Sequence, residues 1–480
     1  MRVKLGMLLL ITIIVGIVLL LILSFSLFSP PSYDSYSIIH FTRHITALFA
    51  TKVIGHILKF MDSYGIYLPL AAIGLWRWGV WIIKKICSYF YSPISVEIPP
   101  YHDTMTIITP VYNENPDVFR RALYSWEANR PDELVAVIDQ SDRRCVEVFE
   151  QFSLHKPWAK LIITSKPGKR RALVDGILNS SGNILALVDS DTIWGEDIKD
   201  KVLAPFMDPE IGGVTTKNHP IELRSVWQEM TDIFWDLRNF QDLPAQTAMG
   251  KAMTCLTGRT SFYRREVILP KLDLFLNEVI LGRKKESGED KCFTRIAQQQ
   301  GWKTYYQSNA VIYSSAPLDF KTFWGQRLRW SRNSHNSDLL SLWQGWAWKH
   351  PFLAFYMVDR FISIFTLFLG PIYLGISIYL NQWLVAVTIV SWWMIGRGIR
   401  IIPHLRRKPR DLFLVPVYVG INFLNGLIKL YALVTIREQK VIRELKEQTK
   451  IENRSVKRIK NVILTAEIIS TLVILVTLLK

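Results

Sequence analysis

Long apolar runs stand near both ends of the chain, and a stretch of mixed composition lies between them. Residues 7–29 form a nearly uncharged run of 23, which is long enough to cross a bilayer as a helix. Further candidate spans cover residues 64–83, 353–380, 383–399, 412–436 and 461–479. The pattern predicts two N-terminal transmembrane helices with a connecting loop (residues 1–90), a soluble domain (residues 100–340), and C-terminal transmembrane and interfacial helices (residues 350–480).

The first span is interpreted as a retained anchor. Its apolar part is too long for a signal peptide, and Pro30 and Pro31 follow it in place of a small-residue cleavage site. If the N-terminus is inside, the second span returns to the same side just before Lys84 and Lys85, as the positive-inside rule expects. This predicts a multi-pass protein of the cell (plasma) membrane, held in the lipid bilayer with the soluble domain in the cytoplasm.

The sequence does not fix the number and orientation of the last membrane spans. Residues 401–411 and 437–460 are both basic, although a full span over residues 412–436 would put them on opposite sides of the membrane. Residues that interrupt this span are Pro416, Gly420, Asn425 and Gly426. The segment is therefore either kinked or re-entrant, or residues 437–460 form a helix on one surface. The count is five or six spans.

Within the soluble stretch, short β-rich runs alternate with helical patterns. The expected strands are residues 104–110, 134–139, 160–165, 184–191 and 212–217, and the expected helices include residues 117–129 and 168–178. This alternation predicts a Rossmann-like α/β domain with a mostly parallel sheet.

Two carboxylates end the apolar run 184–188. Asp189 and Asp191 are one residue apart, so they would point the same way from a buried strand and could hold Mg²⁺ or Mn²⁺. Ligands of parallel sheets bind at the carboxyl ends of the strands. Other polar residues expected at this edge are Tyr112, Glu114, Asp139, Lys169 and Arg170. A metal-bound nucleotide diphosphate would suit such an edge.

The charge and the cysteine content limit the classes of ligand and partner that the protein could bind. The net charge of +17 favours an anionic membrane face or an anionic substrate. The soluble stretch lacks interleaved basic and aromatic repeats, so no nucleic-acid partner is expected. Four cysteines without C-x-x-C spacing indicate reduced thiols, not zinc ligands or disulfides.

An ordered set of motifs now makes a family resemblance specific. The set is TPVYNE (109–114), Asp139, GKR (168–170), DSD (189–191), Lys217, TGR (257–259), GED (288–290) and Q-x-x-R-W (326–330). With apolar spans on both sides, the chain resembles the membrane-embedded family 2 glycosyltransferases. It is most similar to hyaluronan synthases and to alginate and type 3 capsule polymerases. The resemblance implies a GT-A domain inserted between transmembrane helices.

The resemblance also implies roles for residues. A UDP-sugar donor would be held by Pro110, Tyr112, Glu114, Asp139, Lys169, Arg170, Asp189 and Lys217. Asp191, helped by Asp189, would ligate Mg²⁺ or Mn²⁺. Asp290 would be the general base, and the acceptor side would also include Glu289, Gln326, Arg329 and Trp330.

The expected activity is that of a metal-dependent, inverting hexosyltransferase that extends a polysaccharide and secretes it through its own spans. GED replaces the GDD typical of hyaluronan synthases, and TGRTSFYR replaces their GGPLG-like loop. The resemblance therefore does not fix which polymer is made. Four cationic residues lie in or beside the later spans: Arg360, Arg397, Arg400 and Lys429. Their side chains would either line a path for an anionic polymer or extend to the membrane–water interface. Accessory subunits are not specified.

Two other functions compete with this one. The first is transfer of one sugar to a polyprenyl phosphate or another lipid, but such relatives usually lack the Q-x-x-R-W segment. The second is a non-catalytic transport or scaffold subunit. Loss of Asp191 or Asp290 would mark that subunit, and both residues are present.

Overall fold

The computed structural model describes residues 65–97, 100–166 and 168–438. The chain divides into two compact units, Met1–Trp76 and Arg77–Lys480. The described part of the first unit contains the short turn η1 (Gly65–Tyr67) and the beginning of helix α3 (Leu68–Ser88). The spans expected at residues 7–29 and 461–479 lie outside the described residues.

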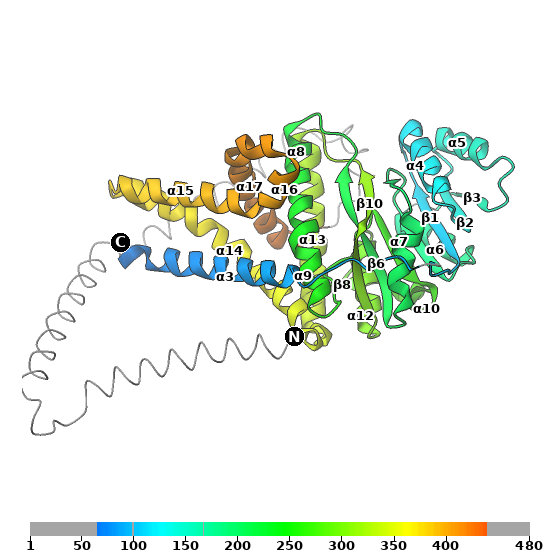
Figure 1. Cartoon of the computed structure of the whole chain (residues 1–480), viewed down its shortest axis with the longest axis horizontal. Coiled ribbons are helices and arrows are strands. Elements are labelled where there is room, and N and C mark those ends of the chain that lie inside the picture. Colours follow the sequence, from blue (N-terminus) through cyan, green and yellow to red (C-terminus); the bar gives the residue numbers. More distant parts are fainter. Residues whose placement is uncertain (1–64, 98–99, 167, 439–480) are drawn as a thin grey trace, which may run out of the picture. The chain divides into compact units, whose positions relative to one another are not determined.

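An eight-stranded sheet forms the centre of the second unit (Figure 1). Its strands are β1 (Met105–Val111), β2 (Glu133–Asp139), β3 (Ala159–Thr164), β4 (Ile184–Val188), β5 (Ile193–Trp194), β6 (Ile211–Pro220), β7 (Thr260–Arg264) and β10 (Lys303–Ser314). The spatial order is β3-β2-β1-β4-β7-β6-β10-β5. A separate hairpin pairs β8 (Val279–Ile280) with β9 (Arg283–Lys284).

The sheet is mixed and not purely parallel. All five strands expected from the apolar runs are present, and those in contact run parallel, as in β1 with β2 and β1 with β4. β7 pairs antiparallel with both β4 and β6, and β5 pairs antiparallel with β10. β6 therefore keeps the direction of β4, and the carboxyl ends of both lie at the same edge.

Helices cover the two faces of the sheet. They are α4 (Pro116–Ala128), α5 (Arg143–Ser153), α6 (Lys169–Leu178), α7 (Ile198–Leu203), α8 (Val226–Leu237), α9 (Leu243–Ala248), α10 (Arg265–Ile268), α11 (Leu272–Leu276) and α12 (Glu289–Gln299), with short turns η2 (Ala204–Met207), η3 (Arg238–Asp242) and η4 (Leu269–Lys271). The long helix α13 (Phe320–Trp343) follows β10 and packs mainly on other helices.

Alternation along the strands builds a core on each face. Ile107 of β1 joins the cluster around Trp126 and Phe149, whereas its neighbour Ile108 joins the cluster around Phe293 on the other face. Because both faces are covered, β2 and β4 are apolar at nearly every position, and polar residues follow where they end.

The C-terminal part of the second unit is helical. It contains η5 (Trp346–Lys349), α14 (Pro351–Tyr379), α15 (Trp383–Arg400), α16 (Ile402–Arg407), η6 (Pro409–Leu414) and α17 (Val415–Val434). Among the described residues, two helical segments are long and apolar enough to cross a membrane, Pro351–Tyr379 and Pro409–Val434. The second is helical throughout, so the interrupting residues do not break it.

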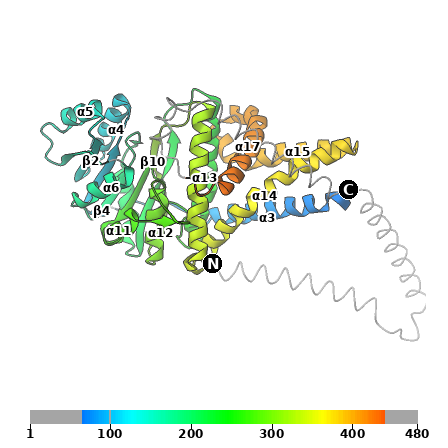
Figure 2. The same ribbon diagram turned by 180° about the vertical axis from the view of Figure 1, so that it is seen from behind.

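The spans expected at residues 64–83 and 383–399 also form helices, α3 and α15. Neither helix belongs to the two described segments that are long and apolar enough to cross a membrane. Tryptophan and arginine lower the hydropathy of both, for example Arg77 in α3 and Arg397 in α15. Helix α13 packs against α17, α14 and α12, and so links the sheet domain to the apolar helices (Figures 1 and 2).

Candidate active site

The polar residues expected at the ends of β1, β2 and β4 do lie along one edge of the sheet, because these strands are parallel neighbours. Asp139 is the last residue of β2, and Asp189 directly follows β4. In the turn after β1, Glu114 accepts a hydrogen bond of 2.9 Å from the Ser190 hydroxyl, which joins this turn to the DSD turn. Tyr112 in the same turn is 47% exposed, so its ring is accessible to a ligand.

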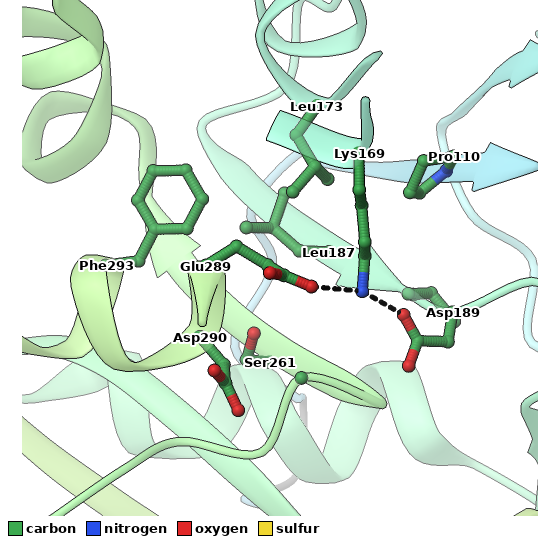
Figure 3. Close-up of a pocket in the computed structure, with 11 residues that line it drawn as sticks. Pro110, Lys169, Leu173, Leu187, Asp189, Ser261, Glu289, Asp290 and Phe293 are labelled. Carbon is green, nitrogen blue, oxygen red and sulfur yellow. Dashed lines mark hydrogen bonds and ion pairs between the residues drawn. The ribbon is translucent and has the colours of Figure 1, made fainter. Parts of the chain in front are cut away.

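A pocket opens beside this edge, where β4 meets the first turns of α6 and α12 (Figure 3). Its walls are Pro110, Lys169, Leu173, Leu187, Val188, Asp189, Gly258, Ser261, Glu289, Asp290 and Phe293. Residues from the GKR, DSD, TGR and GED motifs, far apart in the sequence, therefore border one cavity.

Lys169 links two of these motifs. Its Nζ lies 2.6 Å from Asp189 Oδ1 and 2.7 Å from Glu289 Oε1 (Figure 3). Burial opposes the charged forms, but the two carboxylates raise the pKa of Lys169 above its ordinary value, and Lys169 in turn lowers the pKa of Glu289 to about 2. Lys169 and Glu289 therefore stay charged at neutral pH, and the two ion pairs fix the DSD and GED turns relative to each other.

Asp191 has a different electrostatic environment. Burial and the negative charge of Asp189 raise the pKa of its carboxyl group from 3.8 to about 6, although the positive charge of Arg259 opposes this rise. A carboxylate that is costly to ionise gains from a bound cation. Asp189 and Asp191 together supply the oxygen ligands that Mg²⁺ and Mn²⁺ prefer.

Asp290 stands in the first turn of α12, next to Gly288, whose φ of 83° lies in the left-handed region. Its Oδ1 accepts a hydrogen bond of 2.8 Å from the backbone N–H of Lys291, and the Cys255 thiol lies 3.4 Å from Oδ2. The TGR segment passes very close, because a Cβ on Gly258 would lie 3.3 Å from Asp290 Oδ2. The carboxylate of Asp290 is therefore held in place at the pocket wall.

Helix α13 brings aromatic and basic groups to the same place. The guanidinium of Arg259 lies 4.3 Å from the ring centre of Trp235 and 5.2 Å from that of Trp330. The charge of Arg329 acts on both Arg259 and Glu289. Arg329 and Trp330, predicted from the Q-x-x-R-W motif, thus lie near the DSD and GED turns.

Some buried polar atoms of α13 have no hydrogen-bond partner in the described part of the chain. They include Gln326 Oε1 and the Nε of Arg327. Leaving a buried polar atom unpaired costs roughly 1–3 kcal/mol. Burial and the neighbouring Arg259 lower the pKa of Arg327 to about 10, so this face of the helix is suited to an anionic or hydroxyl-bearing ligand.

Two predicted nucleotide contacts lie elsewhere. Arg170 does not face the pocket, because its buried guanidinium donates to the Phe275 carbonyl and pairs at 2.6 Å with Glu278. Its guanidinium also donates a hydrogen bond of 3.4 Å to the carbonyl of Ser287, the residue before the GED motif. Lys217 of β6 lies 4.3 Å from the ring centre of Phe240, outside the pocket lining.

Sequence reasoning gave no role to two arginines of the site. Arg259 was part of the TGR motif, and its place beside Asp189 follows from the antiparallel pairing of β7 with β4. Arg238 belongs to no recognised motif. It donates a hydrogen bond of 2.8 Å to the Cys255 carbonyl, and its charge acts on Arg259.

Comparison with known proteins agrees with this geometry. Residues 102–333 match a family model described as "Glycosyltransferase like family 2". An N-acetylglucosaminyltransferase of Rhizobium meliloti is 27% identical over 64% of this chain and 76% of its own length. A hyaluronan synthase of Streptococcus pyogenes is 25% identical over 79% of this chain and 93% of its own length.

A solved structure supports the fold. It is the mannosyltransferase PcManGT from Pyrobaculum calidifontis in complex with GDP-Man and Mn²⁺, which matches with a TM-score of 0.51. The match covers 76% of this chain and 97% of that chain at 17% identity. The sheet domain therefore has the α/β glycosyltransferase fold expected from the motifs.

Proposed function

We propose that the protein, whose residues 102–333 match the model of the family 2 glycosyltransferases, is a processive, inverting polysaccharide synthase that uses UDP-sugars. The observation that carries the proposal is the pocket in which Asp290 of the GED turn lies with Asp189 of the DSD turn, the two turns being joined by Lys169. Glycosyl transfer needs a base for the acceptor and positive charge for the leaving group, and this pocket has both at its walls.

The donor would lie along the carboxyl ends of β1, β2 and β4. Pro110, Tyr112, Glu114 and Asp139 surround the place proposed for uridine. Arg259 and Arg329 supply fixed positive charge for the diphosphate, and a planar guanidinium can bond two of its oxygens.

The acidic pair fits a divalent cation, because the raised pKa of Asp191 makes its ionised form depend on a nearby positive charge. Asp191, with Asp189, would hold Mg²⁺ or Mn²⁺. The bound ion would neutralise negative charge on the diphosphate. The similar mannosyltransferase structure, which is a complex with GDP-Man and Mn²⁺, supports this assignment.

Asp290 is proposed to accept the proton of the acceptor hydroxyl. The hydroxyl oxygen then bonds to the anomeric carbon while the bond from that carbon to the diphosphate oxygen breaks, and its electron pair leaves with UDP. One displacement inverts the anomeric centre, so an α-linked donor gives a β-linked product. Trp330 offers a flat apolar face for the acceptor sugar.

Secretion through the protein's own helices completes the proposal. Two helical segments of the described residues, Pro351–Tyr379 and Pro409–Val434, are long and apolar enough to cross a membrane. We propose that they do so in a multi-pass protein of the cell membrane, with residues 100–340 on the cytoplasmic side. Among the cations in these helices, Arg360 pairs with Asp338 of α13 at 2.9 Å, which indicates a structural role. Lys429 and Arg397 are the candidates to meet an anionic, uronate-containing polymer.

The test is turnover of the purified chain in detergent with Mg²⁺ or Mn²⁺. UDP-N-acetylglucosamine is the first donor to test, because one relative is an N-acetylglucosaminyltransferase and another is a hyaluronan synthase. UDP-glucuronate and UDP-glucose are tested next, and all donors are offered alone and in pairs. We expect UDP release with long polymer, and loss of both in Asp290→Asn. Lipid-linked single sugars in place of polymer would contradict processivity, and undiminished turnover by Asp290→Asn would contradict the proposed base.

A further inference from the structure

Three polar side chains converge at a point that the proposed sugar transfer does not use. They are His219 near the end of β6 and, on α8, Asp232 and Asp236, which lie one helical turn apart on the same face. Both aspartate side chains are 0% exposed, and that of His219 is 13% exposed. His219 Nδ1 lies 3.7 Å from the Oδ1 atom of each aspartate, which is too far for a hydrogen bond.

These three atoms are all buried, and none has a hydrogen-bond partner among the residues that the structure describes. All three lie within 4.8 Å of one another. Each unpaired buried polar atom costs roughly 1–3 kcal/mol. Three such atoms aimed at one another therefore indicate a ligand that bonds all of them.

The opposite oxygens of the two aspartates are already engaged. Arg407 Nη2 lies 2.6 Å from Asp232 Oδ2 and 2.7 Å from Asp236 Oδ2. Lys408 Nζ lies 3.0 Å from Asp232 Oδ2, and His404 Nδ1 lies 2.7 Å from Asp236 Oδ2. These contacts fix both carboxylates and leave only the Oδ1 atoms for a further ligand, as bonded outer groups do in many metal sites.

We propose that His219, Asp232 and Asp236 bind a divalent transition-metal cation, with Zn²⁺ as the best match. One imidazole nitrogen and two carboxylate oxygens are a donor set that Zn²⁺ favours, whereas Mg²⁺ and Ca²⁺ prefer oxygen alone. Tetrahedral ligands about 2.1 Å from zinc lie roughly 3.4 Å apart. The observed 3.7 Å separations therefore need to close only slightly.

Such an ion would connect segments that are distant in the sequence. The ligands come from β6 and α8, and the groups that bond those ligands come from α16 and the residues after it. Met230 and Ile233 of α8 also pack against Val415 and Tyr418 at the start of α17. The site would therefore stabilise the junction between the catalytic domain and the last described apolar helix, independently of the proposed sugar chemistry.

The experiment uses the full chain in detergent, stripped with a chelator and titrated with Zn²⁺ alone. The Asp191→Asn background removes the acid pair proposed for the catalytic ion, so that only the new site is counted. Bound zinc is measured by elemental analysis, and thermal unfolding is followed with and without Zn²⁺. Variants are His219→Ala, His219→Gln and the exposed control His102→Ala.

We expect about one tightly bound Zn²⁺ per chain in the background and in His102→Ala, and a higher unfolding temperature when it is bound. His219→Ala and His219→Gln should weaken binding by at least roughly 100-fold and remove the thermal shift. No tight zinc in the background, or the same affinity in the His219 variants, would overturn the proposal. His219→Gln keeps a buried polar group, so folded but zinc-free protein separates lost ligation from lost folding.

Discussion

Asp191 is the residue at which electrostatics gives the sharpest prediction. Its pKa rises from 3.8 to about 6 in the folded chain, so its proton stabilises the fold, and this contribution is lost as the pH rises through about 6. For a partly exposed group the loss is on the order of 2 kcal/mol at neutral pH. We therefore expect Asp191→Asn to unfold at a higher temperature than the unaltered chain at pH 7.5 in chelator, while losing transferase activity.

The matched control is Asp189→Asn, which removes an ion-pair partner of Lys169 and should lower the unfolding temperature. At pH 4 the advantage of Asp191→Asn should disappear, because the native carboxyl group is then protonated in the fold. A less stable Asp191→Asn protein at pH 7.5 would show that burial does not strain this carboxylate.

Gly258 leads to a second prediction at the residue scale. A Cβ there would stand 3.3 Å from Asp290 Oδ2, so Gly258→Ala must displace the proposed base by a few tenths of an ångström. We expect kcat to fall at least roughly tenfold with little change in unfolding temperature, since small misplacements of catalytic groups are costly. The control is Gly325→Ala, which meets nothing within 4 Å and should leave kcat unchanged. Equal kcat values for the two variants would contradict the prediction.

Individual site residues were partly predictable from the sequence. Asp189, Glu289 and Asp290 were predicted because short acidic motifs at strand and helix ends have a local signal, and all three line the pocket. The role of Asp191, predicted in the same way, stays a prediction. The direction in which a long side chain points has no local signal in the sequence. Arg170 therefore enters a buried ion pair that depends on Glu278, a residue more than a hundred positions away.

At the scale of elements, three segments are held together by one buried acid. Glu278 pairs with Arg170 of α6 and with Arg295 of α12, on both sides of the GED turn. Removing one partner of a buried ion network costs about 3–5 kcal/mol, because the remaining charges lose their compensation. We expect Glu278→Gln to lower the free energy of unfolding by about this amount, as measured by denaturant titration.

A surface ion pair provides the comparison. Glu210 pairs with Lys303, and its side chain is 65% exposed. Glu210→Gln should cost less than about 1 kcal/mol, since exposed pairs contribute little. Similar losses for the two variants would mean that the buried network does not stabilise the GED turn as proposed.

The sheet shows which elements a local pattern can reveal. β1, β2, β3, β4 and β6 were expected from apolar runs, because buried parallel strands have a continuous local signal. β7 was not expected, since Thr260–Arg264 reads as part of a motif and becomes a strand only by pairing with both β4 and β6. The mixed direction of the sheet follows from these long-range pairs, which no local pattern contains.

At the scale of the whole molecule, the orientation of the proposed spans follows from the helix that begins after the catalytic domain. α14 starts at Pro351, next to η5, and ends at Tyr379, and α15 returns from Trp383 to the basic end at Arg400. If residues 100–340 are cytoplasmic, the turn at residues 380–382 must lie outside the cell. The basic residues after α15 would then face the cytoplasm again.

This topology can be tested with single cysteines. The native cysteines Cys87, Cys145, Cys255 and Cys292 are all buried, so they should react slowly with a membrane-impermeant maleimide. In intact cells we expect Leu380→Cys, at a position that is 44% exposed, to be labelled, and His102→Cys in the catalytic domain to be protected until the membrane is opened. Labelling of His102→Cys in intact cells would place the catalytic domain outside, where UDP-sugars made in the cytoplasm would not reach it. Protection of Leu380→Cys alone, with normal reaction after lysis, would mean that α14 and α15 do not cross the bilayer, and secretion through these helices would then be excluded.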